Sequence, residues 1–120
     1  MGRVSKTIEL FGVYKSKKIE AMFDTGAKNN FLPSIFKDGE TIEELGFKEF
    51  FGTHSFFMAN ESITKGDIVQ FNEIRIDNLK IKDPIFVILD QLVEDAIVGT
   101  KLMQDNQAII RLGEDTVLFR

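Results

Sequence analysis

The stretch AMFDTGA, residues 21–27, places one acid directly after an apolar run and directly before small residues. The apolar residues from Ile19 to Phe23 predict a strand that enters a core, and Gly26 permits a tight turn and the close approach of another segment. An ionised Asp24 at this place would lose much of its hydration, and acids in such surroundings are typical of functional sites. The stretch therefore predicts a functional acid at the end of a buried strand.

The composition limits the class of protein. The 120 residues are enough for one domain, residues 1–120, and they contain no apolar run long enough for a membrane span or a secretory leader. We therefore expect a cytoplasmic protein with no membrane partner. The sequence has no cysteine, and His54 is its single histidine, which leaves no thiolate metal site and no ordinary Ser-His-Asp triad. A net charge of -4 argues against a nucleic-acid partner.

Apolar alternation predicts a chain made mostly of β-strands. A polar hairpin, residues 12–18, is expected between the first two strands, and a longer hairpin with a polar tip is expected around residues 60–62. The capping-box pattern from Thr41 to Glu44 predicts one or two helical turns, and Thr100 can cap a short helix over residues 100–106. The expected strands cover residues 7–11, 19–23, 47–59, 63–71, 74–76, 79–81, 85–89, 96–99, 108–112 and 116–119, with 85–89 buried on both faces. Residues 31–33 form a short apolar segment that ends at a proline.

Simpler explanations exist for several of these residues. Asp24 could be an ordinary turn residue after a strand, because aspartate and glycine are common there. The lysines of the first hairpin, at 15, 17 and 18, are most simply solvated, and so are the acids Glu40, Glu43 and Glu44. The phenylalanines of residues 47–59 are more often core or interface residues than platforms for stacked bases.

Two motifs together resemble a known family. DTGA at residues 24–27 follows two apolar residues, and IVG at residues 97–99 comes later, directly before the expected short helix. This combination, with a long hairpin between the two motifs, resembles the retropepsin-like, single-domain aspartic peptidases over nearly the whole chain. The resemblance implies an all-β fold, a closed β-barrel of the acid protease type with one short C-terminal helix, and a homodimer in which each chain supplies one catalytic aspartate.

The resemblance also implies roles for individual residues. The catalytic loop would consist of Asp24, Thr25 and Gly26, and paired Asp24 carboxylates would activate a water that hydrolyses a peptide bond, without a metal or a cofactor. An extended polypeptide would be the substrate, and a hairpin over residues 58–65 would close over it. The residues that this resemblance assigns to substrate binding are Ala27, Lys28, Asn29, Met58, Ala59, Asn60, Glu61 and Ser62.

The sequence departs from the retroviral pattern at several positions. Lys28 stands where those enzymes usually carry an acid, and Thr100 stands where they often carry an arginine. Asn30 replaces the usual serine or threonine, and the hairpin tip has no glycine nearer than Gly66. Two other functions therefore remain open at this point. One is a peptide-binding or dimerisation module that has this fold but no proteolytic activity, and the other is a small β-barrel that binds nucleic acid, which the acidic balance disfavours.

Overall fold

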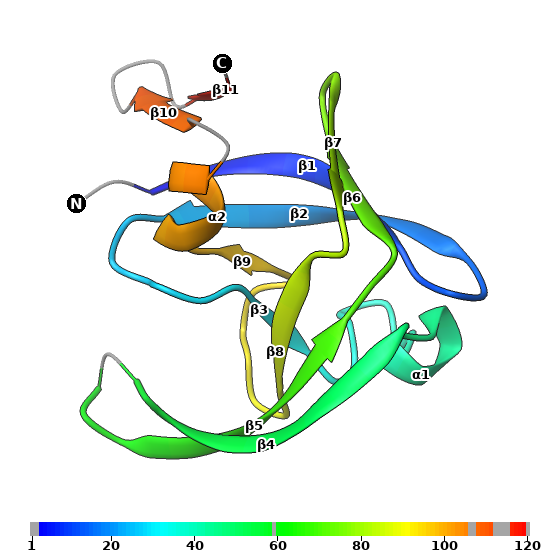
Figure 1. Ribbon diagram of the computed structural model, residues 1–120. Coiled ribbons are helices and arrows are strands. Elements are labelled where there is room, and N and C mark those ends of the chain that lie inside the picture. The colour runs from blue at the N-terminus through cyan, green and yellow to red at the C-terminus, as the bar shows by residue number, and fades with distance from the viewer. Residues whose placement is uncertain (1–2, 59, 106–107, 112–115, 120) are drawn as a thin grey trace.

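The computed structural model describes residues 3–58, 60–105, 108–111 and 116–119 of the chain. Most of these residues lie in β-strands, with two short helices (Figure 1). The elements in chain order are β1 (Arg3–Phe11), β2 (Ser16–Asp24), β3 (Phe31–Pro33), α1 (Ile42–Leu45), β4 (Glu49–Phe57), β5 (Ile63–Gln70), β6 (Glu73–Ile76), β7 (Leu79–Lys82), β8 (Ile85–Leu89), β9 (Ile97–Val98), α2 (Thr100–Asp105), β10 (Ala108–Arg111) and β11 (Thr116–Phe119).

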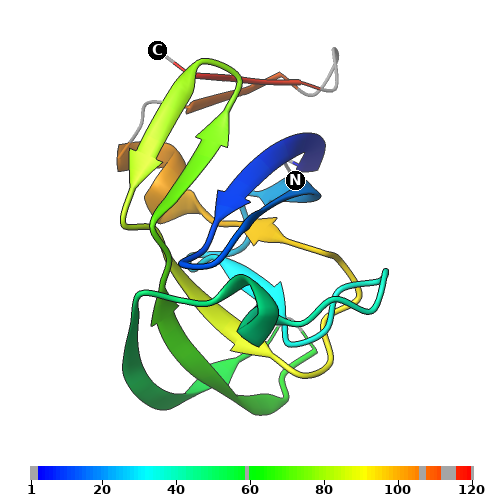
Figure 2. The same ribbon diagram turned by 90° about the vertical axis from the view of Figure 1, so that its right-hand side faces the viewer.

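One nine-stranded sheet makes up most of the fold. Its strand order is β4-β5-β8-β3-β9-β2-β1-β6-β7, so β4 and β7 form its two ends. Figure 2 shows these ends apart, with the β6–β7 hairpin at the top and the β4–β5 hairpin at the bottom. The described strand pairings do not join β4 to β7, and the expected closed barrel is therefore not seen among them. The fold is mostly β, as expected, but its main sheet is open.

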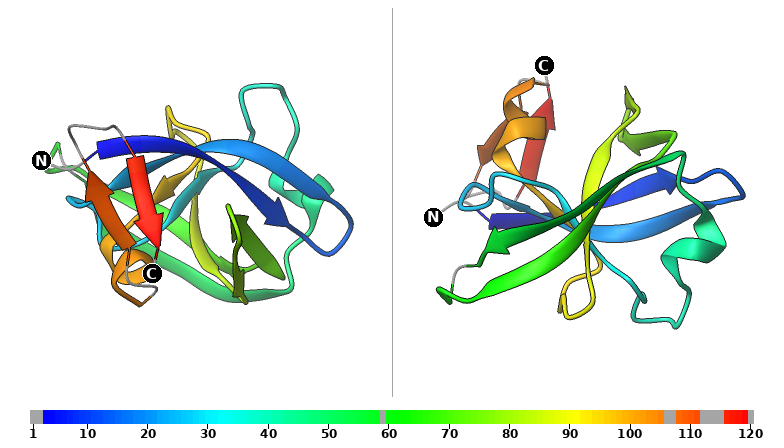
Figure 3. Two further views of the ribbon diagram at one scale, coloured as in Figure 1. Left: turned by 90° about the horizontal axis from the view of Figure 1, so that it is seen from above. Right: turned by 60° about the horizontal axis from the view of Figure 1, so that its bottom comes forward.

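The strands β10 and β11 form a separate two-stranded sheet. This hairpin contacts β1 and α2, and Figure 3 shows it lying above β1 near the start of that strand. Both strands were expected from the sequence. The turn expected at residues 113–115 lies outside the described residues, as do residue 112 of the first expected strand and residue 106 of the expected helix.

Two parallel strand pairs determine where the candidate site lies. The end of β2 pairs in parallel with β9, with Met22 opposite Ile97 and Phe23 opposite Val98. The strand β3 pairs in parallel with β8 and meets β9 in the antiparallel sense at Phe31. Because β9 lies between β2 and β3, the loop that joins those two strands must pass over its end. The fold thus brings both sequence motifs together.

Alternation along β2 explains how the core forms. Ile19, Ala21 and Phe23 are buried, whereas Lys18 and Glu20 between them are exposed, as the pleat of a strand requires. A second and smaller apolar cluster consists of the buried residues Phe31, Val87 and Leu89, with Ala27, Phe56, Met58, Ile68, Leu92 and Ile97 partly buried against them. This second cluster, here called the site cluster, joins the β4–β5 hairpin to the loop after β2.

Helix α1 begins at the capping box that the sequence predicts. The Glu44 backbone N–H donates to Thr41 Oγ1 at 3.2 Å, and the Thr41 backbone N–H donates to Glu44 Oε2 at 3.3 Å. Gly46 ends the helix at a φ of 78°, a conformation that glycine adopts without strain. The helix buries Ile42 and Leu45.

Other local expectations need correction. The strand β8 is not buried on both faces along its whole length, since Ile85 is exposed at its start. The lysines at 17 and 18 belong to β2 and not to a hairpin tip, because the turn before β2 spans only residues 12–15. Lys17 is largely covered and forms ion pairs with Asp38 and Glu40, so its interpretation as a solvated residue was wrong.

Candidate active site

Asp24 lies at the carboxyl end of β2 and is 7% exposed. Among the side chains that the structure describes, it is the one polar or charged side chain that is buried. Its Oδ1 atom accepts a hydrogen bond of 2.8 Å from the Gly26 backbone N–H, and its carbonyl oxygen accepts one of 3.2 Å from the Ala27 N–H. A tight turn thus holds the carboxylate in one orientation, whereas Thr25 and Gly26 are exposed.

The turn after β9 supports this loop through its backbone. The Thr100 N–H donates to the Ala27 carbonyl at 2.7 Å, and the Lys101 N–H donates to the Lys28 carbonyl at 3.3 Å. Gly99 is buried, and a Cβ atom there would lie 2.3 Å from the Asn29 carbonyl oxygen. Any larger residue would therefore push the two segments apart, which explains why a glycine stands at this position.

Asn30 joins three segments through one side chain. Its Oδ1 accepts a hydrogen bond of 2.9 Å from the Gly99 backbone N–H, and its Nδ2 donates one of 3.0 Å to the Ile85 carbonyl. Its own carbonyl accepts a third bond, of 2.8 Å, from the Val87 N–H. An amide side chain, which both donates and accepts, fits this position. Asn30 therefore ties the loop to β8 and β9, although the sequence departs here from the usual serine or threonine.

The β4–β5 hairpin has a tip without glycine. Glu61 turns the chain with a φ of 67°, and Asn60 Oδ1 accepts hydrogen bonds from the Ser62 N–H at 3.1 Å and the Ser62 Oγ at 2.5 Å. Asparagine side chains commonly close turns in this way. The three tip residues are exposed, and Met58 is half-buried against the site cluster. Ala59 lies outside the described residues.

The structure brings the predicted site residues together in two groups. Residues 24–29 form one loop, and residues 60–62 form the hairpin tip on the same side of the molecule (Figure 1). The site cluster links the two groups, because Ala27 and Met58 both pack against it. The hydrogen bonds that the structure shows for the tip residues are internal to the hairpin.

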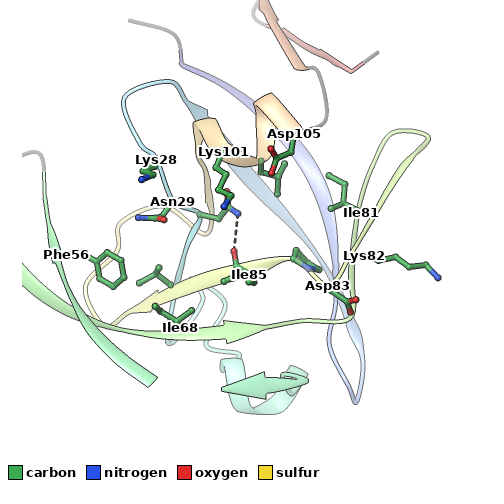
Figure 4. Close-up of a pocket in the computed structure, with 14 residues that line it drawn as sticks. Lys28, Asn29, Phe56, Ile68, Ile81, Lys82, Asp83, Ile85, Lys101 and Asp105 are labelled. Atoms are coloured by element: carbon green, nitrogen blue, oxygen red, sulfur yellow. Dashed lines mark hydrogen bonds between the residues drawn. The ribbon is translucent and has the colours of Figure 1, made fainter. Parts of the chain in front are cut away.

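A groove of about 340 Å³ extends from the loop across β8. It begins at Lys28, and Asp24 is not among its lining residues. Figure 4 shows Lys28, Asn29 and Lys101 along one side, facing Phe56, Ile68 and Ile85. The residues that line it are Lys28, Asn29, Asn30, Phe56, Ile68, Ile81, Lys82, Asp83, Pro84, Ile85, Val87, Lys101, Leu102 and Asp105. An apolar floor with polar groups on one edge is typical of ligand sites.

Several of these groove residues could not be recognised as site residues in the sequence. Nothing in the sequence indicated that Lys101 belongs to a site, because a lysine on a short helix is ordinarily solvated. Phe56 was expected in a core or an interface, and it is half-buried in the groove wall, in edge-to-face contact with Phe31 at a centroid distance of 6.1 Å. The neighbouring phenylalanines Phe50, Phe51 and Phe57 are exposed in the single chain and are not core residues.

The described residues contain neither a candidate metal site nor a candidate membrane-spanning helix. No group of three or more histidine, cysteine, aspartate or glutamate side chains among them could hold a metal ion. No described helix has the length and apolar character needed to cross a membrane.

Comparisons with known proteins agree with the geometry. The sequence matches the family model described as aspartyl protease over residues 7–102. A solved structure of a retropepsin-like aspartic protease from Rickettsia conorii resembles the chain with a TM-score of 0.64 and 19% sequence identity, over 91% of this chain and 76% of that chain. Such a likeness shows a shared fold. No match was found among curated proteins. The family match covers both motifs of the candidate site, and the chain therefore belongs to the aspartyl protease family, with a retropepsin-like fold.

Proposed function

We propose that this chain is an aspartic endopeptidase that acts as a homodimer. One observation carries the proposal: the one buried polar side chain of the described residues, Asp24, stands on the family's motif, with its Oδ1 held by the Gly26 N–H at 2.8 Å. Burying a carboxylate is unfavourable, so its position at the end of β2 needs a functional explanation. Peptide hydrolysis by paired carboxylates provides one.

The mechanism requires two copies of Asp24. Two carboxylates in close contact do not both ionise readily, so in aspartic proteases they share one proton. The ionised Asp24 takes a proton from a water molecule, and the protonated Asp24 of the second copy donates a hydrogen bond to the carbonyl of the scissile bond. The water oxygen then attacks the carbonyl carbon, and the amine leaves after it has received a proton. One chain supplies one such aspartate, which is why we propose a dimer.

An extended polypeptide is the proposed substrate. The β4–β5 hairpin and the loop of residues 24–29 both border the site cluster, so a peptide that lies between them would contact apolar side chains from both. A hairpin that closes over a peptide can add main-chain hydrogen bonds and exclude water from the reacting bond. We assign this closing role to Met58, Asn60, Glu61 and Ser62.

Cleavage of an unstructured protein tests the proposal. We expect the purified chain to hydrolyse it in an assay that covers about pH 4 to pH 7. A statine-type inhibitor should stop the cleavage, and Asp24→Asn should reduce the rate by at least about a thousandfold, because the amide is not a base. A matched control is Asp90→Asn, which changes an exposed acid outside the candidate site.

Two results would contradict the proposal. If Asp24→Asn cleaves at a rate comparable to the wild type after contaminating peptidases have been removed, Asp24 is not the catalytic acid. If the wild type binds peptides but cleaves none of them at any pH tested, the chain is a peptide-binding module on this fold.

A further inference from the structure

Two lysines that are distant in the sequence meet at one edge of the groove. Lys28 lies on the loop after β2, and Lys101 lies in the first turn of α2. The Lys101 backbone N–H donates to the Lys28 carbonyl at 3.3 Å, which fixes the two residues side by side. Both side chains are exposed and both line the groove. The fold therefore places two positively charged residues on the same edge of an apolar groove.

These two charges lack an acidic partner within the described part of the chain. The ion pairs seen there involve other cations, such as Lys6 with Asp77 and Lys48 with Asp83. Two positive charges on one edge of a groove attract an anion that enters it. The chain carries 19 acidic residues against 15 basic ones, so a general excess of positive charge does not explain this pair of lysines.

The acids that line the groove do not cancel the two charges. Asp83 Oδ1 accepts a hydrogen bond of 2.6 Å from Lys48 Nζ and is therefore already paired with another lysine. Asp105 lies one helical turn after Lys101, but no ion pair joins them in the structure. Figure 4 shows Lys82 pointing away from the groove and the Asp83 carboxylate at its far end. The edge formed by Lys28 and Lys101 therefore faces the groove with a net positive charge.

We propose that this groove selects an acidic side chain, glutamate or aspartate, in the peptide substrate. The carboxylate would lie between Lys28 Nζ and Lys101 Nζ, and the neighbouring part of the peptide would pack on Phe56, Ile68 and Ile85. Charge complementarity identifies the occupant, since a basic edge over an apolar floor suits an acidic residue next to apolar ones. The proposal rests on the proposed peptide-binding role of the site and names the substrate class.

Binding to the Asp24→Asn variant tests this proposal without requiring cleavage. The probes are three fluorescein-labelled apolar peptides that differ at one position, which carries glutamate, glutamine or lysine, and fluorescence anisotropy at about pH 7 measures their affinity. We expect the glutamate peptide to bind about fivefold to tenfold more tightly than the glutamine peptide at low salt. The lysine peptide should bind most weakly. Salt at about 0.5 M should shrink the difference, because it screens exposed charges.

Charge reversal identifies the residues responsible. In the same background, Lys28→Glu with Lys101→Glu should reverse the order of the glutamate and lysine peptides, whereas Lys28→Arg with Lys101→Arg should keep the glutamate preference. Lys80→Gln is the matched control, because it removes an exposed positive charge outside the groove. Circular dichroism and thermal melting establish that each variant is folded. The arginine variant also keeps the experiment decisive if the charge-reversed variant fails to fold.

Three results would overturn the acidic preference. These are equal binding of the glutamate and glutamine peptides, a glutamate preference that survives charge reversal, and the absence of binding by all three peptides. Loss of the proposed catalytic function would appear differently, as a glutamate preference in binding with no cleavage by the wild type. The two proposals can therefore fail separately.

Discussion

Asp24→Asn separates the proposed catalytic role of the residue from its role in the fold. The amide oxygen can still accept the hydrogen bond from the Gly26 N–H, which measures 2.8 Å in the wild type, so the loop should keep its shape. In a dimer, two neighbouring carboxylates repel, and the amide removes that repulsion. We expect the melting temperature to stay unchanged or to rise by up to about 4 °C, as measured by differential scanning calorimetry. A marked fall in melting temperature would show that the carboxylate stabilises the fold.

Asn30→Ala tests how much one side chain contributes to holding the loop. The substitution removes the acceptor of the Gly99 N–H and the donor to the Ile85 carbonyl. Because the partly buried Gly99 N–H would then lack its partner, we expect the free energy of unfolding to fall by about 1–3 kcal/mol in a urea titration. Asn29→Ala, the exposed neighbour, should change the free energy of unfolding by less than about 0.5 kcal/mol. Equal effects of the two variants would contradict the role assigned to Asn30.

The first hairpin is held to the loop of residues 36–40 by charges. Lys17 forms ion pairs with Asp38 and with Glu40, the latter at 2.9 Å, and its ammonium lies 5.2 Å from the centroid of the Phe36 ring. The hydrogen bond with Asp38 raises the pKa of Lys17, and the hydrogen bond with Lys17 lowers the pKa of Asp38. The pKa of Glu40 is lowered mainly by its hydrogen bond with Lys15 and, after that in size, by its hydrogen bond with Lys17.

These shifts predict how the stability conferred by the Lys17 ion pairs depends on pH. A carboxyl group with a lowered pKa stabilises the folded state while it is ionised, and that stabilisation is lost as the pH falls through its folded-state pKa. Lys17, with a raised pKa, contributes until the pH rises through its own folded-state pKa. Lys17→Met should therefore lower the melting temperature slightly at about pH 7 and have less effect below about pH 3. Lys37→Met serves as the exposed control, and a difference that stays constant across this range would contradict the explanation.

The tip of the β4–β5 hairpin is expected to move when peptides bind. Its turn depends on Asn60 Oδ1, which accepts the hydrogen bonds that the Ser62 N–H and Oγ donate, so Asn60→Ala should speed the backbone hydrogen exchange of Ser62 by about tenfold. In the wild type, a statine-type inhibitor should slow exchange at residues 60–62 if the hairpin closes over it as proposed. Nuclear magnetic resonance resolves both effects. If exchange at the tip is unaffected by an inhibitor that binds, another segment covers the site.

At the scale of the whole molecule, activity should depend on protein concentration. One chain supplies one Asp24, so a monomer holds half of the proposed site, and specific activity should fall when dilution dissociates the dimer. We expect residues 3–10 and 116–119 to form the contact between the two copies, because residues 3–8 of β1 have no strand partner on their second side in the described pairings. Analytical ultracentrifugation over the same concentrations measures the fraction of dimer. A fully active monomer would contradict the proposed mechanism.

Some features of the molecule followed from the sequence because they depend on near neighbours. The capping box of Thr41 and Glu44 involves residues three positions apart, and it formed as predicted. The apolar alternation that ends at Asp24 placed this acid at the end of a strand, and the structure confirms its position and its burial. The strand β1 was expected to start at residue 7 but begins at Arg3, since the polar residues before Thr7 hide the alternation.

Other features were decided only by the tertiary structure, because they depend on which distant segments pair. The sequence alone does not specify the strand order, the open ends at β4 and β7, or the position of β9 between β2 and β3. The groove and the meeting of Lys28 with Lys101 arise from that order, since the turn after β9 must pack under the loop after β2. The sequence by itself thus determined the Asp24 motif and its strand, through local periodicity and turn chemistry. Long-range strand pairing decided which side chains surround the motif.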